Sequence, residues 1–346
     1  MIRYAFVLLL LPSVSQARPY YAASKGLSCA ACHIAPSGGG MRLQTPNSAG
    51  TITDKIAVGA DFRAYFTQVQ KAQSSTFSIA RSALYVSAEP RPDTQVVYDN
   101  DNGLTAQTYA IWRYQGDIPF YARAGRFWIP YGIQWDDPDN AIFSQKNPFA
   151  PNVGFTIDQS AADTGLELGL APKKDYFVNL SFTNGQPGGQ PDNSERKSVT
   201  GRGGYIFDNF MIGGTFYNGK SGPLAIHKEQ TRYGPIAWFK LNRAVLIYEL
   251  GIGDDKPNPG GTTTTTTHLI TNAAEIDFEP VIGWLGKLRY DSLNPDTQTP
   301  NLRVERYTIG IERILRNISF EAAYRFNNET PQVANDQVLL LTHVWF

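Results

Sequence analysis

Residues 281–291 read VIGWLGKLRYD, and apolar and polar side chains alternate along them. One parity carries large apolar or aromatic side chains, namely Ile282, Trp284, Leu288 and Tyr290. The other parity carries the cations Lys287 and Arg289. Successive side chains of a β-strand point to opposite faces, so this alternation predicts a strand with one apolar and one charged face. Such a strand suits the wall of a membrane barrel, with lipid outside and an aqueous lumen inside.

The same pattern recurs from residue 51 onward, in segments of about ten residues separated by Gly, Pro, Asn and Asp. We predict sixteen strands, at residues 54–67, 76–88, 94–99, 104–114, 119–128, 162–171, 175–184, 198–207, 210–218, 231–240, 244–252, 269–278, 281–291, 303–314, 318–327 and 337–346. The predicted fold is an all-β transmembrane antiparallel β-barrel of about 16 strands, spanning residues 51–346 and preceded by a short segment.

The lengths of the connections predict the orientation of this barrel. They alternate along the chain, with 68–75, 100–103 and 129–161 among the long ones and 89–93 among the short ones. Outer-membrane barrels have long external loops and short periplasmic turns, so both ends of the barrel sequence should face the periplasm. The 129–161 loop either folds inward and narrows the pore or lies on the surface as a solvated loop.

Composition excludes several other classes of protein. Charged residues make up 18% of the chain, below the usual value of about 25%, while aromatic residues make up 12%. No apolar run reaches the 18 or more residues that a membrane-spanning helix needs. Lys and Arg balance Asp and Glu at 31 each, without a basic cluster, which argues against a nucleic-acid partner.

Both ends of the sequence suggest export to an outer membrane. Residues 1–17 combine Arg3, an apolar core and the small-residue site Ser15-Gln16-Ala17, the pattern of a secretory signal peptide. The final segment, 337–346, ends in Phe346 and resembles the carboxy-terminal assembly signal of Gram-negative outer-membrane proteins. A soluble β-sandwich or propeller, which also has many short strands, is the alternative fold.

The two cysteines of the chain lie in the motif Cys29-Ala30-Ala31-Cys32-His33. Two residues between cysteines, followed directly by His, is the attachment pattern of a c-type haem. Cys29 and Cys32 would form the two thioethers, and His33 would be the proximal ligand of the haem iron. A disulfide or a redox-active dithiol is the competing interpretation.

The second axial ligand has several candidates, because Met and His are common partners of haem iron. Met41 is local to the motif, and His343 has inward parity near the periplasmic mouth of the barrel. Met211, at the base of its strand, is a weaker candidate, and a five-coordinate iron is the remaining alternative. His227 and His268 are set aside, because both fall in predicted external loops.

Residues 18–50 would form a monohaem cytochrome segment. A segment of this length is too short to bury a haem alone, so it should pack against the barrel and act as a plug of its lumen. Within Tyr20–Gly50, the CAACH motif with Pro36 three residues later, placed ahead of a barrel, resembles the fused monohaem cytochrome–porin proteins of iron-oxidising bacteria. The resemblance implies electron passage across the outer membrane through one covalent haem c at the periplasmic end.

Three functions follow from these features. The first is electron transfer between a periplasmic carrier and an external donor or acceptor, with iron as one example, by a protein embedded in outer-membrane lipid. The second is a diffusion porin whose haem segment is a plug or sensor without electron throughput, and the third is a soluble periplasmic β-rich cytochrome. Hydrolytic and transferase motifs are lacking, so an enzyme of this sequence would be a one-electron oxidoreductase, for example an iron(II) oxidase. A homotrimer is left open as the assembly.

Overall fold

The computed structural model describes residues 19–36, 51–53, 55–70, 74–101, 104–114, 116–133, 162–170, 175–185, 197–221, 228–257, 265–315, 317–330 and 335–345. The predicted signal peptide, Met41, His227 and Phe346 lie outside these residues. None of the described helices is long and apolar enough to cross a membrane.

Two short helices precede the strands: α1 (Pro19–Ser24) and the 3-10 helix η2 (Cys29–Ala31). The strands are β1 (Thr51–Thr53), β2 (Ile56–Val69), β3 (Ser74–Arg91), β4 (Thr94–Asp101), β5 (Leu104–Tyr114), β6 (Phe120–Phe127), β7 (Asp163–Leu170), β8 (Tyr176–Thr183), β9 (Ser198–Ile206), β10 (Phe210–Ser221), β11 (Lys228–Leu241), β12 (Ala244–Pro257), β13 (Thr267–Val281), β14 (Trp284–Asn294), β15 (Val304–Ile314), β16 (Ile318–Asn328) and β17 (Gln337–Trp345).

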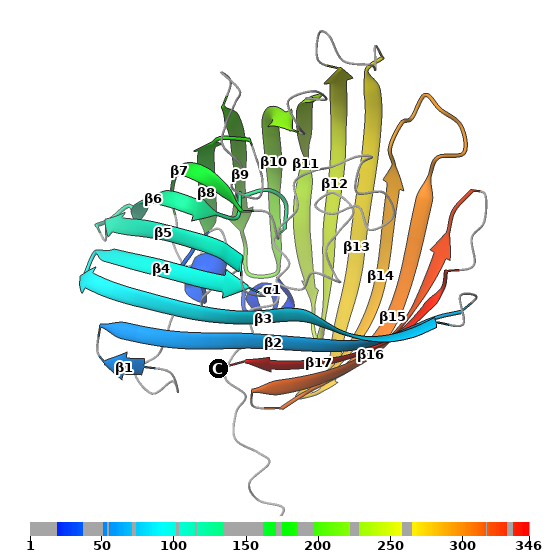
Figure 1. The fold of residues 1–346 in the computed structure, drawn as a ribbon, viewed down its shortest axis with the longest axis horizontal. Helices are drawn as coiled ribbons and strands as arrows, with labels where there is room; N and C mark the ends of the chain where they lie inside the picture. Colours follow the sequence, from blue (N-terminus) through cyan, green and yellow to red (C-terminus); the bar gives the residue numbers. More distant parts are fainter. Residues whose placement is uncertain are drawn as a thin grey trace, which may run out of the picture.

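The strands β2 to β17 form a closed antiparallel barrel of 16 strands (Figure 1). Each pairs with its neighbours in the sequence, and β17 closes the ring on β2, with Leu341 opposite Tyr65 and His343 opposite Arg63. The remaining strand, β1, forms a small hairpin with the start of β2, where Thr51 lies opposite Ala57. A closed ring leaves no unpaired edge, so every strand can lie against lipid with its backbone groups bonded.

The sixteen predicted strands correspond one to one with β2–β17, which confirms the barrel and excludes the sandwich and the propeller. Strand β1 was not predicted. The prediction was also wrong for Ile282, which lies in the turn between β13 and β14 and not in a strand. The next residue, Gly283, has a φ of 81°, and this left-handed conformation, which glycine adopts readily, turns the chain there.

The predicted facing of the strands is confirmed. Trp284 and Leu288 on β14 are exposed on the outer surface, whereas Lys287 and Arg289 are buried at 4% and 5% exposure on the lumen side. On β17, Val338, Leu340 and Val344 are likewise exposed, and His343 is buried. The outer faces of these strands are therefore apolar, and their inner faces carry charged side chains beside apolar ones such as Leu285 and Leu341, in keeping with a lipid-embedded barrel.

The β4–β5 connection differs in length from the prediction. We use the name short-turn end for the end of the barrel that carries the connections β3–β4, β5–β6, β7–β8, β9–β10, β11–β12, β13–β14 and β15–β16. The β4–β5 connection at the opposite end was predicted to be long, yet Asp101 pairs with Leu104 and only residues 102–103 lie between them. The reason lies in their sequence, since Asn-Gly is strongly favoured in two-residue hairpins.

Candidate functional site in the barrel lumen

The lumen wall of β6–β9 carries a network of buried polar side chains. Arg123 and Glu167 form an ion pair across β6 and β7, and neither side chain has any exposed surface. Tyr121 donates its hydroxyl hydrogen to Glu167, and Asn179 donates from Nδ2 to the Tyr121 oxygen at 2.6 Å. Arg202 on β9 extends the network through a 3.1 Å bond from Nε to Oδ1 of Asn179. The charges of Arg123 and Glu167 are tolerated at this depth because they are paired with each other.

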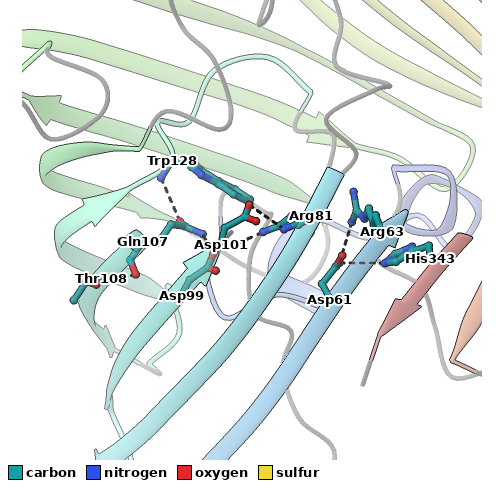
Figure 2. A network of polar contacts seen from close by, with 9 residues as sticks. All are labelled: Asp61, Arg63, Arg81, Asp99, Asp101, Gln107, Thr108, Trp128 and His343. Carbon is teal, nitrogen blue, oxygen red and sulfur yellow. Dashed lines mark hydrogen bonds and ion pairs between the residues drawn. The ribbon is translucent and has the colours of Figure 1, made fainter. Parts of the chain in front are cut away.

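A second network joins the two strands that close the barrel. His343 on β17 lies opposite Arg63 on β2. Asp61 Oδ2 bonds both side chains, at 3.1 Å to His343 Nε2 and at 3.0 Å to Arg63 Nη2 (Figure 2). All three residues have inward parity, so the register of β2 with β17 brings them together.

The adjacent strands β3–β5 continue this polar wall (Figure 2). Arg81 lies 3.8 Å from Asp99 and 3.4 Å from Asp101, and its guanidinium lies 5.2 Å from the ring centre of Trp128. Gln107 donates to Asp99 at 3.3 Å and accepts from the backbone N–H of Trp128 at 3.2 Å. The hydrogen bond from Trp128 to Gln107 therefore attaches the chain to the lumen wall directly after strand β6 ends.

Lys287 and Arg289, which the sequence assigned to the lumen, form ion pairs there. Lys287 Nζ lies 2.9 Å from Glu321. Arg289 pairs with Asp291 at 2.9 Å and with Glu275, directly opposite on β13, at 3.3 Å. These cations are paired locally with carboxylates, so this part of the lumen wall carries alternating charges and is not purely basic.

The start of the β6–β7 connection crosses the lumen, which supports the inward alternative for this loop. We call residues Trp128–Ile133 the inward segment. Gly132 N donates to Thr215 Oγ1 on β10 at 3.0 Å, and Ile133 N donates to Glu249 Oε2 on β12 at 2.7 Å. Arg202 on β9 donates to the Gly132 carbonyl at 2.8 Å. The segment therefore leaves the β6 wall and binds the wall formed by β9–β12.

Residues 19–36, called the plug segment below, lie inside the ring of strands (Figure 1). Tyr20 and Ala23 of α1 share an apolar cluster with inward side chains such as Ile236 and Trp238 of β11. Tyr20 also donates to Glu279 at 3.3 Å, near the end of β13. Burial, and next the Glu279 charge, raise the pKa of Tyr20 above its ordinary range, so the phenol stays protonated and can donate.

The far end of the plug segment packs on the opposite wall. Ile34 and Ala35 are at most 1% exposed and join a cluster of inward side chains from β3–β6, which includes Tyr109 and Ile111. Arg113, two residues beyond Ile111 on β5, donates from Nη2 to the Ile34 carbonyl at 2.6 Å. The plug segment thus spans the lumen near the short-turn end, and the CAACH motif lies between its two attachments.

The residues of the motif fit the covalent attachment of a haem. Cys29 and Cys32 form no disulfide and are partly exposed, and the 3-10 turn is closed by bonds from Cys32 N and His33 N to the Cys29 carbonyl. His33 is buried at 6% exposure. One turn therefore presents two accessible thiols and an imidazole, which is the donor set of a c-type haem.

The structure places two of the candidate distal ligands, and Met41 lies outside the described residues. Met211 is buried in the apolar cluster of Tyr20 and Ala23. His343 is held by Asp61 through Nε2, so the iron would have to compete for this nitrogen. His268 was predicted to lie in a loop but lies in β13, at the end opposite the short-turn end, with its Nδ1 2.6 Å from Asp254.

Sequence reasoning missed Arg113 and Glu249, which hold the plug segment and the inward segment. Both have inward parity on predicted strands, so the alternation could have placed them in the lumen. Their partners, however, are backbone groups of segments distant in the sequence, and no sequence pattern identifies such pairs.

The architecture can be compared with solved structures. The chain aligns over 86% of its length with all of the Vibrio cholerae outer membrane protein OmpT in its trimer form, at 9% identity and a TM-score of 0.62. Its similarity to the outer membrane channel DcaP of Acinetobacter baumannii has a TM-score of 0.61, at 10% identity over 86% of this chain and 100% of that one. The chain has the porin fold.

A third porin, Salmonella typhi OmpF in complex with daunomycin, aligns with a TM-score of 0.58 and 13% identity, over 84% of this chain and 97% of its own. At these identities the likeness concerns the fold alone. No protein-family model and no curated protein matches the sequence. The porin fold covers the barrel, so the chemistry of the CAACH motif must be argued from the chain itself.

Proposed function

We propose that this protein is a porin-type channel of the bacterial outer membrane, and that small polar solutes and ions cross through its lumen. The observation that carries the proposal is a closed barrel with an apolar outer face and a lumen lined by paired charges. A 16-stranded barrel encloses an aqueous channel. The inward segment narrows this channel, and the plug segment narrows it further at the short-turn end.

We place the short-turn end in the periplasm, because outer-membrane barrels have short periplasmic turns and long external loops. The plug segment would then face the periplasm, and outer-membrane lipid would contact the exposed apolar side chains. The OmpT structure is of a trimer form, which makes a homotrimer the assembly to test by chemical cross-linking in native membranes.

The channel function is tested by adding the purified protein to planar lipid bilayers. We expect ion conductance in discrete steps, smaller than that of a porin with an open lumen. Liposome swelling with sugars of increasing size would then measure the solute cut-off. A protein that folds into bilayers, migrates on gels in a heat-modifiable way and conducts no ions would contradict the channel proposal.

Gly132→Ala should widen the channel. Gly132 has a φ of 61°, and an added Cβ would lie 2.5 Å from Glu249 Oε2, on the carboxylate that holds Ile133. Strain of roughly 1–3 kcal/mol should weaken the attachment of the inward segment and raise the single-channel conductance. Gly283→Ala is the matched control, because Gly283 has a similar φ of 81° in a turn at the rim. Equal conductance of the two variants would argue against an obstructing inward segment.

A second function, electron transfer across the outer membrane, is favoured by the location of the CAACH motif within the lumen. We propose that Cys29 and Cys32 bind one covalent haem c and that His33 is its proximal ligand. The haem would supply one-electron exchange at iron. The resemblance to fused cytochrome–porin proteins points to a periplasmic carrier on one side and an external donor or acceptor, such as iron, on the other.

The distal ligand is tested by absorption spectra of oxidised and reduced protein. Because Asp61 already holds His343 Nε2, we expect His343→Ala to leave the spin state of the haem unchanged. Met41→Ala and Met211→Ala test the other two candidate ligands. Replacement of the residue that binds the iron would convert a low-spin haem to a high-spin one. Conversion to a high-spin haem in His343→Ala would show that the imidazole leaves Asp61 to bind iron. Unaltered spectra in all three variants would support a five-coordinate iron or another ligand.

A further inference from the structure

Arg113 contacts the plug segment at the residue that follows His33. We infer that Arg113 is a positioning residue for the Cys29–His33 turn, and that it fixes this turn against the β3–β6 wall. The part of this inference that concerns haem properties rests on the proposed haem function, whereas the part that concerns the position of the turn does not.

The first step of the argument is the geometry of the contact. Arg113 has inward parity on β5, one residue from the end of the strand, and its Nη2 lies 2.6 Å from the Ile34 carbonyl oxygen. Its Nη1 is bonded at 3.2 Å to Oε1 of Gln95 on β4, and its backbone N–H is bonded to the Asp93 carbonyl. The guanidinium is therefore oriented by the barrel wall, and a charged donor at this distance makes a strong bond.

The second step is the difference between this contact and the others of the plug segment. Ile34 and Ala35 pack in an apolar cluster, and such packing is not directional. Tyr20 bonds Glu279 at the other end of the segment, nine residues before Cys29. The Arg113 bond falls on the carbonyl of Ile34, the residue after His33, so it fixes the direction in which the chain leaves the motif turn.

The third step concerns the chemistry at His33. Groups in the second shell of a metal site orient the ligands, and their loss changes the properties of the metal. The Arg113 charge is held at the carbonyl of the residue after His33, and a fixed cation near a haem should disfavour the ferric state and so raise the reduction potential. Arg113 thereby combines two effects, attachment of the turn and a positive charge near it, and a lysine at the same position keeps the charge but lacks the forked guanidinium that bonds Gln95 and Ile34 at once.

The first arm of the test uses the full-length chain produced without haem and folded into detergent micelles. The rates at which Cys29 and Cys32 react with a bulky maleimide report the exposure of the turn. We expect Arg113→Ala to react several-fold faster than the wild type. Arg313→Ala is the matched control, because Arg313 also donates to a backbone carbonyl at the short-turn end, that of Ile282 at 3.2 Å, but within the barrel wall. Equal rates in Arg113→Ala and the wild type would overturn the inference.

The second arm uses protein from cells that mature c-type cytochromes. We expect Arg113→Ala to retain covalent haem with a lowered midpoint potential, and Arg113→Lys to lie closer to the wild-type potential. An unchanged potential in Arg113→Ala would overturn the role of this residue toward haem. A wild type that binds no haem would instead refute the proposed haem function, and the maleimide rates would still decide whether Arg113 positions the turn.

Discussion

Replacing both Cys29 and Cys32 with serine is expected to abolish covalent haem and electron transfer while leaving the barrel intact. The two cysteines lie on the plug segment and form no disulfide, whereas the barrel is held by strand pairing in which neither cysteine takes part. The measurement is made in proteoliposomes that contain an internal dye oxidant and receive an impermeable external reductant. The wild type should reduce the dye faster than the double variant, and only the wild type should give haem-stained bands on denaturing gels.

The controls for this experiment separate the two proposed functions. Heat-modifiable migration must be the same for both proteins, so that a difference in dye reduction reflects haem and not folding. Conductance of the double variant should be retained, because the channel depends on the barrel. Equal rates of dye reduction by the two proteins would refute electron transfer and leave the channel as the function of the chain.

Arg123→Ala is expected to have the largest effect on stability. Both Arg123 and Glu167 have fully buried side chains, and removal of the guanidinium leaves the Glu167 charge buried, with Tyr121 as its remaining side-chain donor among the residues that the structure describes. Breaking a buried ion pair costs about 3–5 kcal/mol of the free energy of unfolding. Urea unfolding in lipid vesicles, followed by tryptophan fluorescence, would measure this loss.

Two control variants test the reason for the loss. Arg303→Ala removes an exposed cation, 56% accessible, that lies 2.8 Å from Glu305, and should cost less than about 1 kcal/mol. Joint replacement of Arg123 by Met and Glu167 by Leu removes both charges and should cost less than Arg123→Ala alone. If the double replacement is as damaging as the single one, packing and not charge burial is the cause.

Some features followed from the sequence because they depend on the local pattern of side chains. The alternation along 281–291 and 337–346 placed Lys287, Arg289 and His343 in the lumen, and the structure confirms all three. Strand boundaries were predicted less accurately from the sequence. Ile282 shows why, because it continues the apolar parity of the strand but lies in the turn. The β4–β5 hairpin could have been predicted from Asn102-Gly103 had turn chemistry been weighed above loop-length alternation.

The partners of the lumen charges could not be predicted in the same way. Parity shows that a side chain faces the lumen but not which carboxylate it meets. Asp61 and His343 pair only because β17 closes on β2, across 282 positions of sequence. Arg289 and Glu275 are adjacent only in the register of β13 with β14. Register is a property of the assembled sheet, so these pairs required the structure.

The sequence alone determined the strands, the facing of their side chains and the haem-type motif Cys29–His33, because periodicity and motif spacing are local. Only the tertiary structure decided that the inward segment crosses to β9–β12 and that the plug segment spans the lumen from Glu279 to Arg113. The physical reason is that these contacts join groups far apart in the chain, two of them a side chain to a backbone group and one of them two side chains. Such groups meet only after closure of the ring has fixed the position of every strand.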